Sequence, residues 1–206
     1  MGNIRKSLYL ALFSILFLAL ATGGFAQENK IRASECALDE TLLEQQAEAL
    51  LDSMTTEQKV CQMFIVTPEA LTNGAVVTSV DETARNYLKE CPVGGLVYFS
   101  KNLTDAEQTK ELLRSMQAFA MEIEGLPLFQ CVDEEGGKVA RVGNHKGFDV
   151  PKVGAMGNIV TPEDAYAAGS TIGTYLNELG FTLDFAPDAD VLSNPRNTVI
   201  GNRSFG

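Results

Sequence analysis

Residues 126–137 read LPLFQCVDEEGG. The part from Leu126 to Val132 is largely apolar and of strand length, which predicts a strand that is buried on both faces. Three carboxylates, Asp133 to Glu135, follow it, and two glycines then allow the chain to turn sharply. An acidic cluster at the carboxyl end of a buried strand is where α/β proteins commonly place polar chemistry. The alternative for an isolated acidic triplet is a solvated turn.

Outward from this strand, strand and helix patterns alternate along the chain. The strand patterns cover residues 60–66, 94–99, 126–132 and 182–187. The helical patterns cover residues 39–54, 81–90, 104–124 and 161–179. The first half of 60–66 also fits the end of a helix. Thr104 and Glu107 predict a capping box, while Gly125 and Gly180 predict helix ends.

Such alternation implies parallel strands that are joined by crossover helices. Four βα units make about half of a (β/α)8 barrel, which typically needs ~250 residues. The predicted fold class is therefore α/β, a TIM-type (β/α)8 barrel truncated to about its first four βα units.

Residues 1–26 have the pattern of a cleaved secretory signal peptide. Arg5 and Lys6 precede an uncharged run from Leu8 to Ala21, and Gly24 and Ala26 are small residues at the positions that a signal peptidase recognises. The run is short for a membrane span, which needs roughly 20 residues. An uncleaved anchor is the alternative. We expect an exported protein, periplasmic or extracellular, with no membrane contact after cleavage.

The expected mature chain has a flexible start over residues 27–38 and one partial domain over 39–206. The formal net charge of the whole chain is −11, and it falls to −13 when Arg5 and Lys6, the only charged residues of the signal peptide, are removed. An acidic surface repels phosphate backbones, so nucleic acid is not an expected partner.

The cysteines give little support to a metal site. Cys61 and Cys131 lie in apolar runs, where a free cysteine is usually a small buried hydrophobic residue. Cys36–Cys91 is then the one disulfide to test. The spacing fits no zinc signature and the chain has a single histidine, so no metal is expected.

Further polar residues are candidates for a shared site with the triplet. Asp184, Asp188 and Asp190 would face one way if the last strand were regular. The alternative, which Pro187 favours, is that these carboxylates accept hydrogen bonds from loop N–H groups.

The remaining candidates are cations and one histidine. Arg141 and Arg203 carry planar guanidinium groups that suit a substrate or a carboxylate partner. His145 lies in a predicted surface loop, where we expect no catalytic role. No P-loop, GxGxxG, HExxH or GxSxG motif occurs, which argues against nucleotide binding, zinc proteolysis and α/β-hydrolase chemistry.

Taken in order, five motifs resemble the N-terminal catalytic domain of glycoside hydrolase family 3, and within it the β-N-acetylhexosaminidase branch. The resemblance covers about residues 50–206. It is carried by residues 54–64 (MTTEQKVCQMF), 93–99 (VGGLVYF), 132–137 (VDEEGG) with Arg141, 183–190 (LDFAPDAD) and 194–206 (NPRNTVIGNRSFG).

The resemblance implies a retaining mechanism, in which an Asp attacks the anomeric carbon and a covalent glycosyl-enzyme forms without a metal or cofactor. It implies that Asp133 and Arg203 bind hydroxyls of the terminal sugar, with Arg141 in a supporting role. The nucleophile and the acid/base His are expected beyond the position of Gly206, so no catalytic residue is expected in this chain.

The expected function is hydrolysis of terminal β-linked N-acetylhexosamine from glycans or peptidoglycan fragments, with this chain as an N-terminal fragment. Two alternatives are a family 3 β-glucosidase and a non-catalytic carbohydrate-binding or degenerate module.

Overall fold

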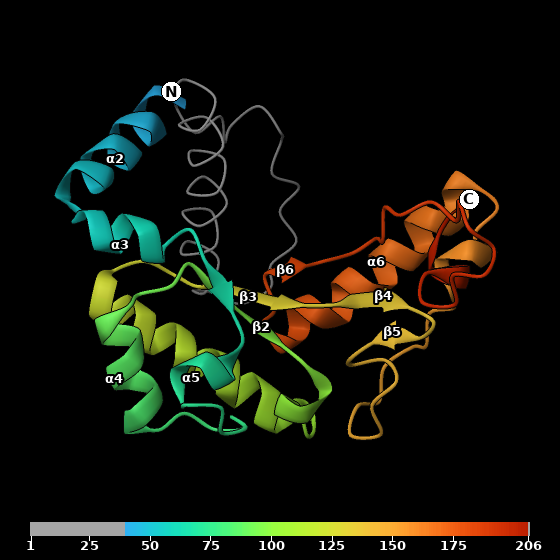
Figure 1. Ribbon diagram of the computed structural model, residues 1–206, viewed down its shortest axis with the longest axis horizontal. Helices are drawn as coiled ribbons and strands as arrows, with labels where there is room; N and C mark the ends of the chain where they lie inside the picture. The colour runs from blue at the N-terminus through green and yellow to red at the C-terminus, as the bar shows by residue number, and fades with distance from the viewer. Residues whose placement is uncertain (1–39, 206) are drawn as a thin grey trace, which may run out of the picture. The chain divides into compact units, whose positions relative to one another are not determined.

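The computed structural model describes residues 40–205 of the chain (Figure 1). The expected signal peptide, the expected flexible start and Cys36 lie outside the described residues. The chain divides into two compact units, with the boundary between Val60 and Cys61.

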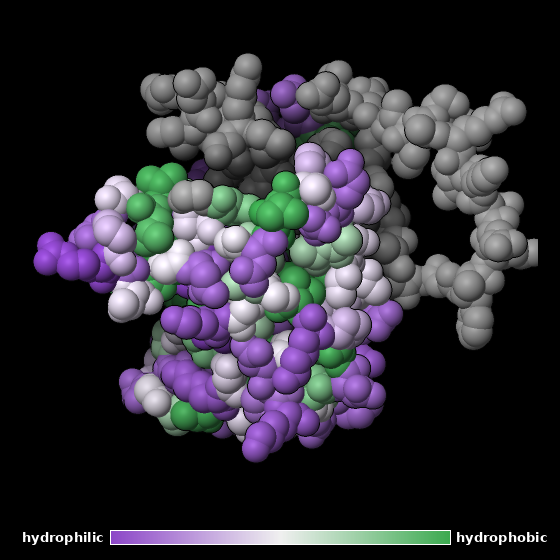
Figure 2. All heavy atoms as spheres, turned by 90° about the vertical axis from the view of Figure 1, so that its right-hand side faces the viewer, coloured by the Kyte–Doolittle hydropathy of each residue, from purple (hydrophilic) through white to green (hydrophobic). Residues whose placement is uncertain are grey.

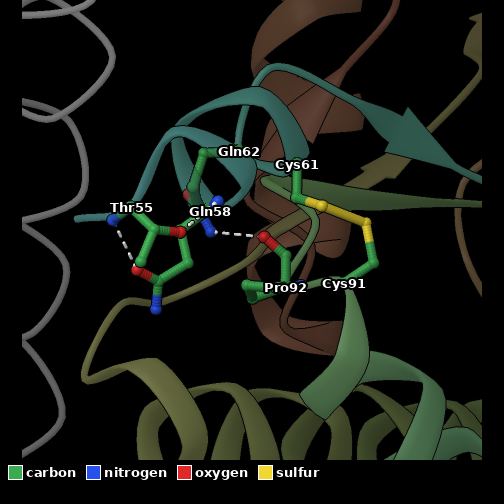
Figure 3. The surroundings of a disulfide bond; sticks show 6 residues. All are labelled: Thr55, Gln58, Cys61, Gln62, Cys91 and Pro92. Carbon is green, nitrogen blue, oxygen red and sulfur yellow. Dashed lines mark hydrogen bonds between the residues drawn. A yellow bond between two sulfur atoms is a disulfide. The ribbon is translucent and has the colours of Figure 1, made fainter.

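Helix α2 (Glu40–Ser53) and most of the short helix α3 (Thr56–Cys61) belong to the first unit. α2 confirms the helix predicted over residues 39–54. Thr55 begins α3 with a reciprocal capping pair (Figure 3). Its Oγ1 accepts a hydrogen bond from the Gln58 N–H at 3.2 Å, and its own N–H donates to Gln58 Oε1 at 2.8 Å.

A parallel sheet with the strand order β1-β2-β3-β6 forms the centre of the second unit. The strands are β1 (Ile65–Val66), β2 (Gly95–Tyr98), β3 (Phe129–Val132) and β6 (Leu183–Asp184). Val132 pairs with Tyr98 on one side and with Asp184 on the other. The carboxyl ends of β2, β3 and β6 therefore meet at one edge of the sheet.

Three helices connect these strands: α4 (Glu82–Glu90), α5 (Ala106–Glu124) and α6 (Pro162–Leu179). α4 contacts α5 and α5 contacts α6, so the helices form a layer along the sheet (Figure 1). Their buried side chains share one core with the strands, including Leu88, Leu96, Leu112, Met116, Val132 and Leu176. This alternation is the α/β pattern of a partial TIM-type (β/α)8 barrel.

Most of the predicted helix ends are confirmed. Thr161 Oγ1 accepts from the Asp164 N–H at 3.1 Å and begins α6. Gly125 and Gly180 end α5 and α6 in the left-handed region, with φ values of 67° and 101°. These two positions favour glycine because a side chain is strained there.

The capping box predicted for Thr104 and Glu107 is wrong by one residue. Asp105 is the N-cap of α5, and its Oδ1 accepts from the Gln108 N–H at 2.9 Å. Gln108 Oε1 accepts from the Thr104 N–H at 2.9 Å. The Asp carboxylate is as good a cap as the Thr hydroxyl, and Gln108 rather than Glu107 reaches back over the helix start.

All four strands are shorter than predicted, and the first and the last are shortened most. In the region 60–66 only Ile65 and Val66 form a strand, and the residues up to Cys61 complete α3, as the alternative had it. The last strand ends at Asp184 because its partner β3 ends at Val132. Asp188 therefore lies in the loop beyond the strand.

The pair Cys36–Cys91, which the sequence singled out as the one disulfide to test, does not form, because Cys91 is bonded to Cys61 (Figure 3). Cys61 ends α3 and Cys91 caps the end of α4, and these helices lead into the neighbouring strands β1 and β2. Their Cα atoms are 5.7 Å apart. The apolar run around Cys61 had suggested a buried free thiol, but the paired strands bring the two cysteines together.

Cys131 is free and buried, as predicted. Burial, with a smaller contribution from the nearby Asp133 carboxylate, raises the pKa of its thiol to about 12. It is therefore protonated at neutral pH and serves as a small core residue.

Candidate functional site

A small antiparallel hairpin follows β3 directly and consists of β4 (Glu134–Gly136) and β5 (Val139–Ala140). Its turn passes through Gly136 and Gly137, with φ values of 88° and 59°. A Cβ at Gly137 would lie 2.8 Å from the Cα of Ala155. The positive φ values and the lack of space for a side chain both favour glycine in this turn. The turn brings the chain back beside the end of β3.

Asp133, at the end of β3, forms an ion pair with Arg141, which follows β5. Arg141 Nη2 lies 3.0 Å from Asp133 Oδ2. The guanidinium also lies over the ring of Phe99, 5.2 Å from its centroid, and Phe99 directly follows β2. The side chains of Arg141 and Asp133 remain 27% and 24% exposed. One accessible cation is thus held by the loops after two neighbouring strands.

Arg203 reaches the acidic triplet from the far end of the chain, in the 3₁₀ helix η4 (Gly201–Arg203). Its Nε and Nη2 donate to the two oxygens of Glu135, each at 2.8 Å. Asp188 Oδ2 lies 3.3 Å from the same Nη2. The hydrogen bonds to Glu135 raise the pKa of Arg203 above its ordinary value. This bidentate pair fixes the C-terminal loop to the end of β3.

Glu134, between these two ion pairs, is fully buried. Its carboxylate accepts hydrogen bonds from the Val142 N–H at 2.8 Å, the Gly143 N–H at 2.7 Å and the Tyr175 hydroxyl at 2.7 Å. No separate role is predicted for Glu134 from the sequence, where it is one member of the acidic triplet. The signal that could have revealed its burial is the alternation of side chains in an extended segment, which points the middle residue of the triplet away from its two neighbours.

Asp184, at the end of β6, accepts a hydrogen bond from the Glu134 N–H at 2.8 Å. Burial raises its pKa to about 6, and the neighbouring carboxylates, Glu134 foremost, add to this increase. Asp188 Oδ1 likewise accepts from the Asp190 N–H at 2.9 Å. These contacts confirm the interpretation of Asp184 and Asp188 as acceptors for backbone N–H groups.

The structure therefore ties both candidate arginines to the acidic triplet. Glu134 and Glu135 are buried, so the triplet is not a solvated turn. His145 lies in a turn, where its ring meets Phe148 edge-on at 5.5 Å and its Nδ1 accepts from the Gly147 N–H. These contacts give it a local structural role, and its side chain is half-buried rather than fully solvated.

Within residues 40–205, no group of three or more His, Cys, Asp or Glu side chains is arranged to hold a metal ion. No helix in this part of the chain combines the length and the apolar character that crossing a membrane requires. The face in Figure 2 lies on the side of the β4–β5 hairpin and the C-terminal loop, and polar side chains separate its apolar ones into small patches.

A parallel α/β sheet whose strand ends carry paired carboxylates and arginines defines a class of barrel-type proteins with a strand-end site. The family model of the glycosyl hydrolase family 3 N terminal domain matches residues 55–206. The chain belongs to this family.

Two relatives carry the name beta-hexosaminidase. The chain is 34% identical over 135 residues to beta-hexosaminidase A of Pseudoalteromonas piscicida, covering 64% of this chain and 23% of that protein. It is 41% identical over 81 residues to the beta-hexosaminidase LpqI of Mycobacterium tuberculosis, covering 39% of this chain and 21% of that protein.

A solved structure agrees with these relatives. It is a glycoside hydrolase family 3 beta-N-acetylglucosaminidase from Paenibacillus sp. str. FPU-7, which superposes with a TM-score of 0.65 and 34% identity over 75% of this chain and 28% of that one. The chain thus spans about a quarter of the length of these proteins.

Proposed function

We propose that the chain forms the sugar-binding part of a retaining glycoside hydrolase that acts on terminal β-linked N-acetylglucosamine. The observation that carries this proposal is that Arg141 and Arg203 are both ion-paired with the acidic triplet at the end of β3. Planar carboxylates and guanidinium groups suit the paired hydroxyls of a sugar ring. The names of the relatives support N-acetylglucosamine as the sugar.

The residues have different roles in this proposal. Asp133 accepts hydrogen bonds from sugar hydroxyls, and Arg203 donates to oxygens of the same sugar. Arg141 positions Asp133 through their 3.0 Å ion pair. We expect the nucleophile and the acid/base at positions that follow Gly206, and we therefore expect residues 27–206 to bind the sugar without hydrolysing its glycosides.

A titration of N-acetylglucosamine, followed by protein NMR, tests this proposal. The Asp133→Asn variant should bind about tenfold more weakly, because it loses a charged acceptor. Asp149→Asn, which changes an exposed carboxylate in another loop, is the matched control and should bind normally. Equal affinity of the Asp133→Asn variant and the wild type would contradict the proposal. A parallel titration with glucose separates the glucosidase alternative.

We also propose that the protein is exported and that its signal peptide is cleaved after Ala26. The disulfide between Cys61 and Cys91 supports this proposal, since such bonds persist mainly in oxidising compartments. Amino-terminal sequencing of the protein from a secreting host should give Gln27 as the first residue. An intact Met1 in that material would contradict it.

A further inference from the structure

Carboxylates outnumber cations at the candidate site. Asp133, Glu135 and Asp188 contact the two arginines, while Glu134 and Asp184 lie directly behind them. Arg141 is paired with Asp133, and Arg203 is paired with both Glu135 and Asp188. Neither guanidinium therefore has a positive charge left over for an anionic ligand.

Asp188 makes carboxylates outnumber the single cation around Arg203. Its side chain is only 7% exposed, and its buried Oδ2 accepts no hydrogen bond although it lies 3.3 Å from Arg203 Nη2. Glu135 already engages the Nε and Nη2 edge of the guanidinium with both of its oxygens. Asp188 is thus a second negative charge on one cation, and these three side chains together carry a net charge of one negative unit.

We propose that Asp188 determines charge selectivity at this site, so that the site takes neutral or cationic amino sugars and rejects acidic sugars. This inference rests on the proposed sugar-binding function. A carboxylate on the sugar, beside Arg203, would face Glu135 and Asp188 at close range. At a separation of ~5 Å near a protein surface, this repulsion lowers affinity about tenfold or more. A hydroxyl group suffers no such repulsion.

The test compares three probes of similar size on the whole chain by NMR titration: N-acetylglucosamine, glucosamine and glucuronic acid. We expect the wild type to bind the neutral and cationic sugars and to bind glucuronic acid about tenfold more weakly. Asp188→Asn keeps an oxygen that can accept the Asp190 N–H but removes the charge. It should raise the ratio of the glucuronic acid affinity to the N-acetylglucosamine affinity about three- to tenfold.

Asp149→Asn is the matched control, because it removes the same unit of charge from an exposed side chain in another loop. It should leave the ratio of the affinities unchanged. Equal changes of this affinity ratio in the two variants would overturn the role of Asp188, because the net charge of the protein would then explain the effect. Loss of all sugar binding in a folded Asp188→Asn variant would also overturn it, because the residue would then be structural.

The result for the wild type separates this inference from the proposed function. If glucuronic acid binds as tightly as N-acetylglucosamine, the inference fails and the proposed function stands. If none of the three sugars binds, the proposed function fails and the inference fails with it.

Discussion

Three consecutive carboxylates at the end of β3 have three different surroundings. Asp133 and Glu135 each hold an arginine, whereas Glu134 is buried and bonded to two backbone N–H groups and one hydroxyl. The alternation of side chains along an extended segment produces this division. The buried member anchors the loop from which Arg141 projects, and the outer members carry the ion pairs.

Replacement of Glu134 by Leu should destabilise the protein strongly. The change leaves the Val142 and Gly143 N–H groups and the Tyr175 hydroxyl without their acceptor, at a cost on the order of 3–5 kcal/mol. Tyr175→Phe removes a single hydrogen bond and should cost about 1–2 kcal/mol. Denaturant unfolding of both variants measures these values. Equal and small losses would show that the Glu134 carboxylate is not the anchor.

The raised pKa of Asp184 makes the stability of the protein depend on pH. Its pKa rises from an ordinary 3.8 to about 6 on folding, so the folded state binds its proton more tightly. This carboxyl therefore favours the folded state below about pH 4, and the contribution is lost as the pH rises through about 6.

Asp184→Asn removes the charge and keeps an acceptor for the Glu134 N–H. The variant should be more stable than the wild type at pH 7, by on the order of 1 kcal/mol after allowance for solvent screening. The variant should also lack the part of the wild-type loss of stability that occurs as the pH rises from about 4 to 6. Urea unfolding at several pH values measures both effects, and parallel curves for the two proteins would refute the assignment.

The sequence predicted Asp133, Arg141 and Arg203 as site residues, but not the partners of Arg203. The contact between Arg203 and Glu135 depends on the path of the loop between β6 and η4, and no local pattern encodes that path. The role of Glu134 is not evident from the sequence because its partners, the adjacent N–H groups of Val142 and Gly143 and the hydroxyl of Tyr175, lie in two other parts of the chain. Local chemistry identified the charged groups, and tertiary contacts decided their pairing.

Among the helices and strands, local signals predicted the helices better than the strand ends. Thr161, Gly125 and Gly180 mark helix boundaries through their own hydrogen bonds or backbone conformations, so they could be identified from the sequence. The last strand stops at Asp184 because its neighbour stops at Val132, and this information is not in the strand itself.

The corrected cap of α5 gives a direct test at this scale. Asp105→Ala removes the acceptor of the Gln108 N–H and should cost about 1 kcal/mol. Thr104→Ala keeps the backbone N–H that bonds to Gln108 and should change stability by no more than about 0.5 kcal/mol. Thermal unfolding of the pair distinguishes them. A larger loss of stability for Thr104→Ala than for Asp105→Ala would support Thr104 as the N-cap instead.

Across the second unit, the disulfide and the candidate site occupy opposite ends of the parallel strands. Cys61 and Cys91 precede β1 and β2, whereas Asp133 follows β3 and Asp184 ends β6. In barrel folds the carboxyl end carries function and the amino end contributes stability. The disulfide should therefore affect stability and leave sugar binding unchanged.

The double variant Cys61→Ser/Cys91→Ser should be less stable by about 3–4 kcal/mol, since the bond closes a loop with a sequence separation of 30. For a chain of this size, the melting temperature should fall on the order of 10 °C. A reducing agent should lower the melting temperature of the wild type and leave that of the double variant unchanged. An equal effect of the reducing agent on both proteins would contradict a disulfide at this position.

An experimental structure of the chain with N-acetylglucosamine bound tests the proposed sugar site most directly. We expect sugar hydroxyls at about 2.7–3.2 Å from the Asp133 carboxylate and the Arg203 guanidinium, with the Asp133–Arg141 pair in place. A sugar that binds elsewhere, while Asp133 and Arg203 touch only protein, would contradict it.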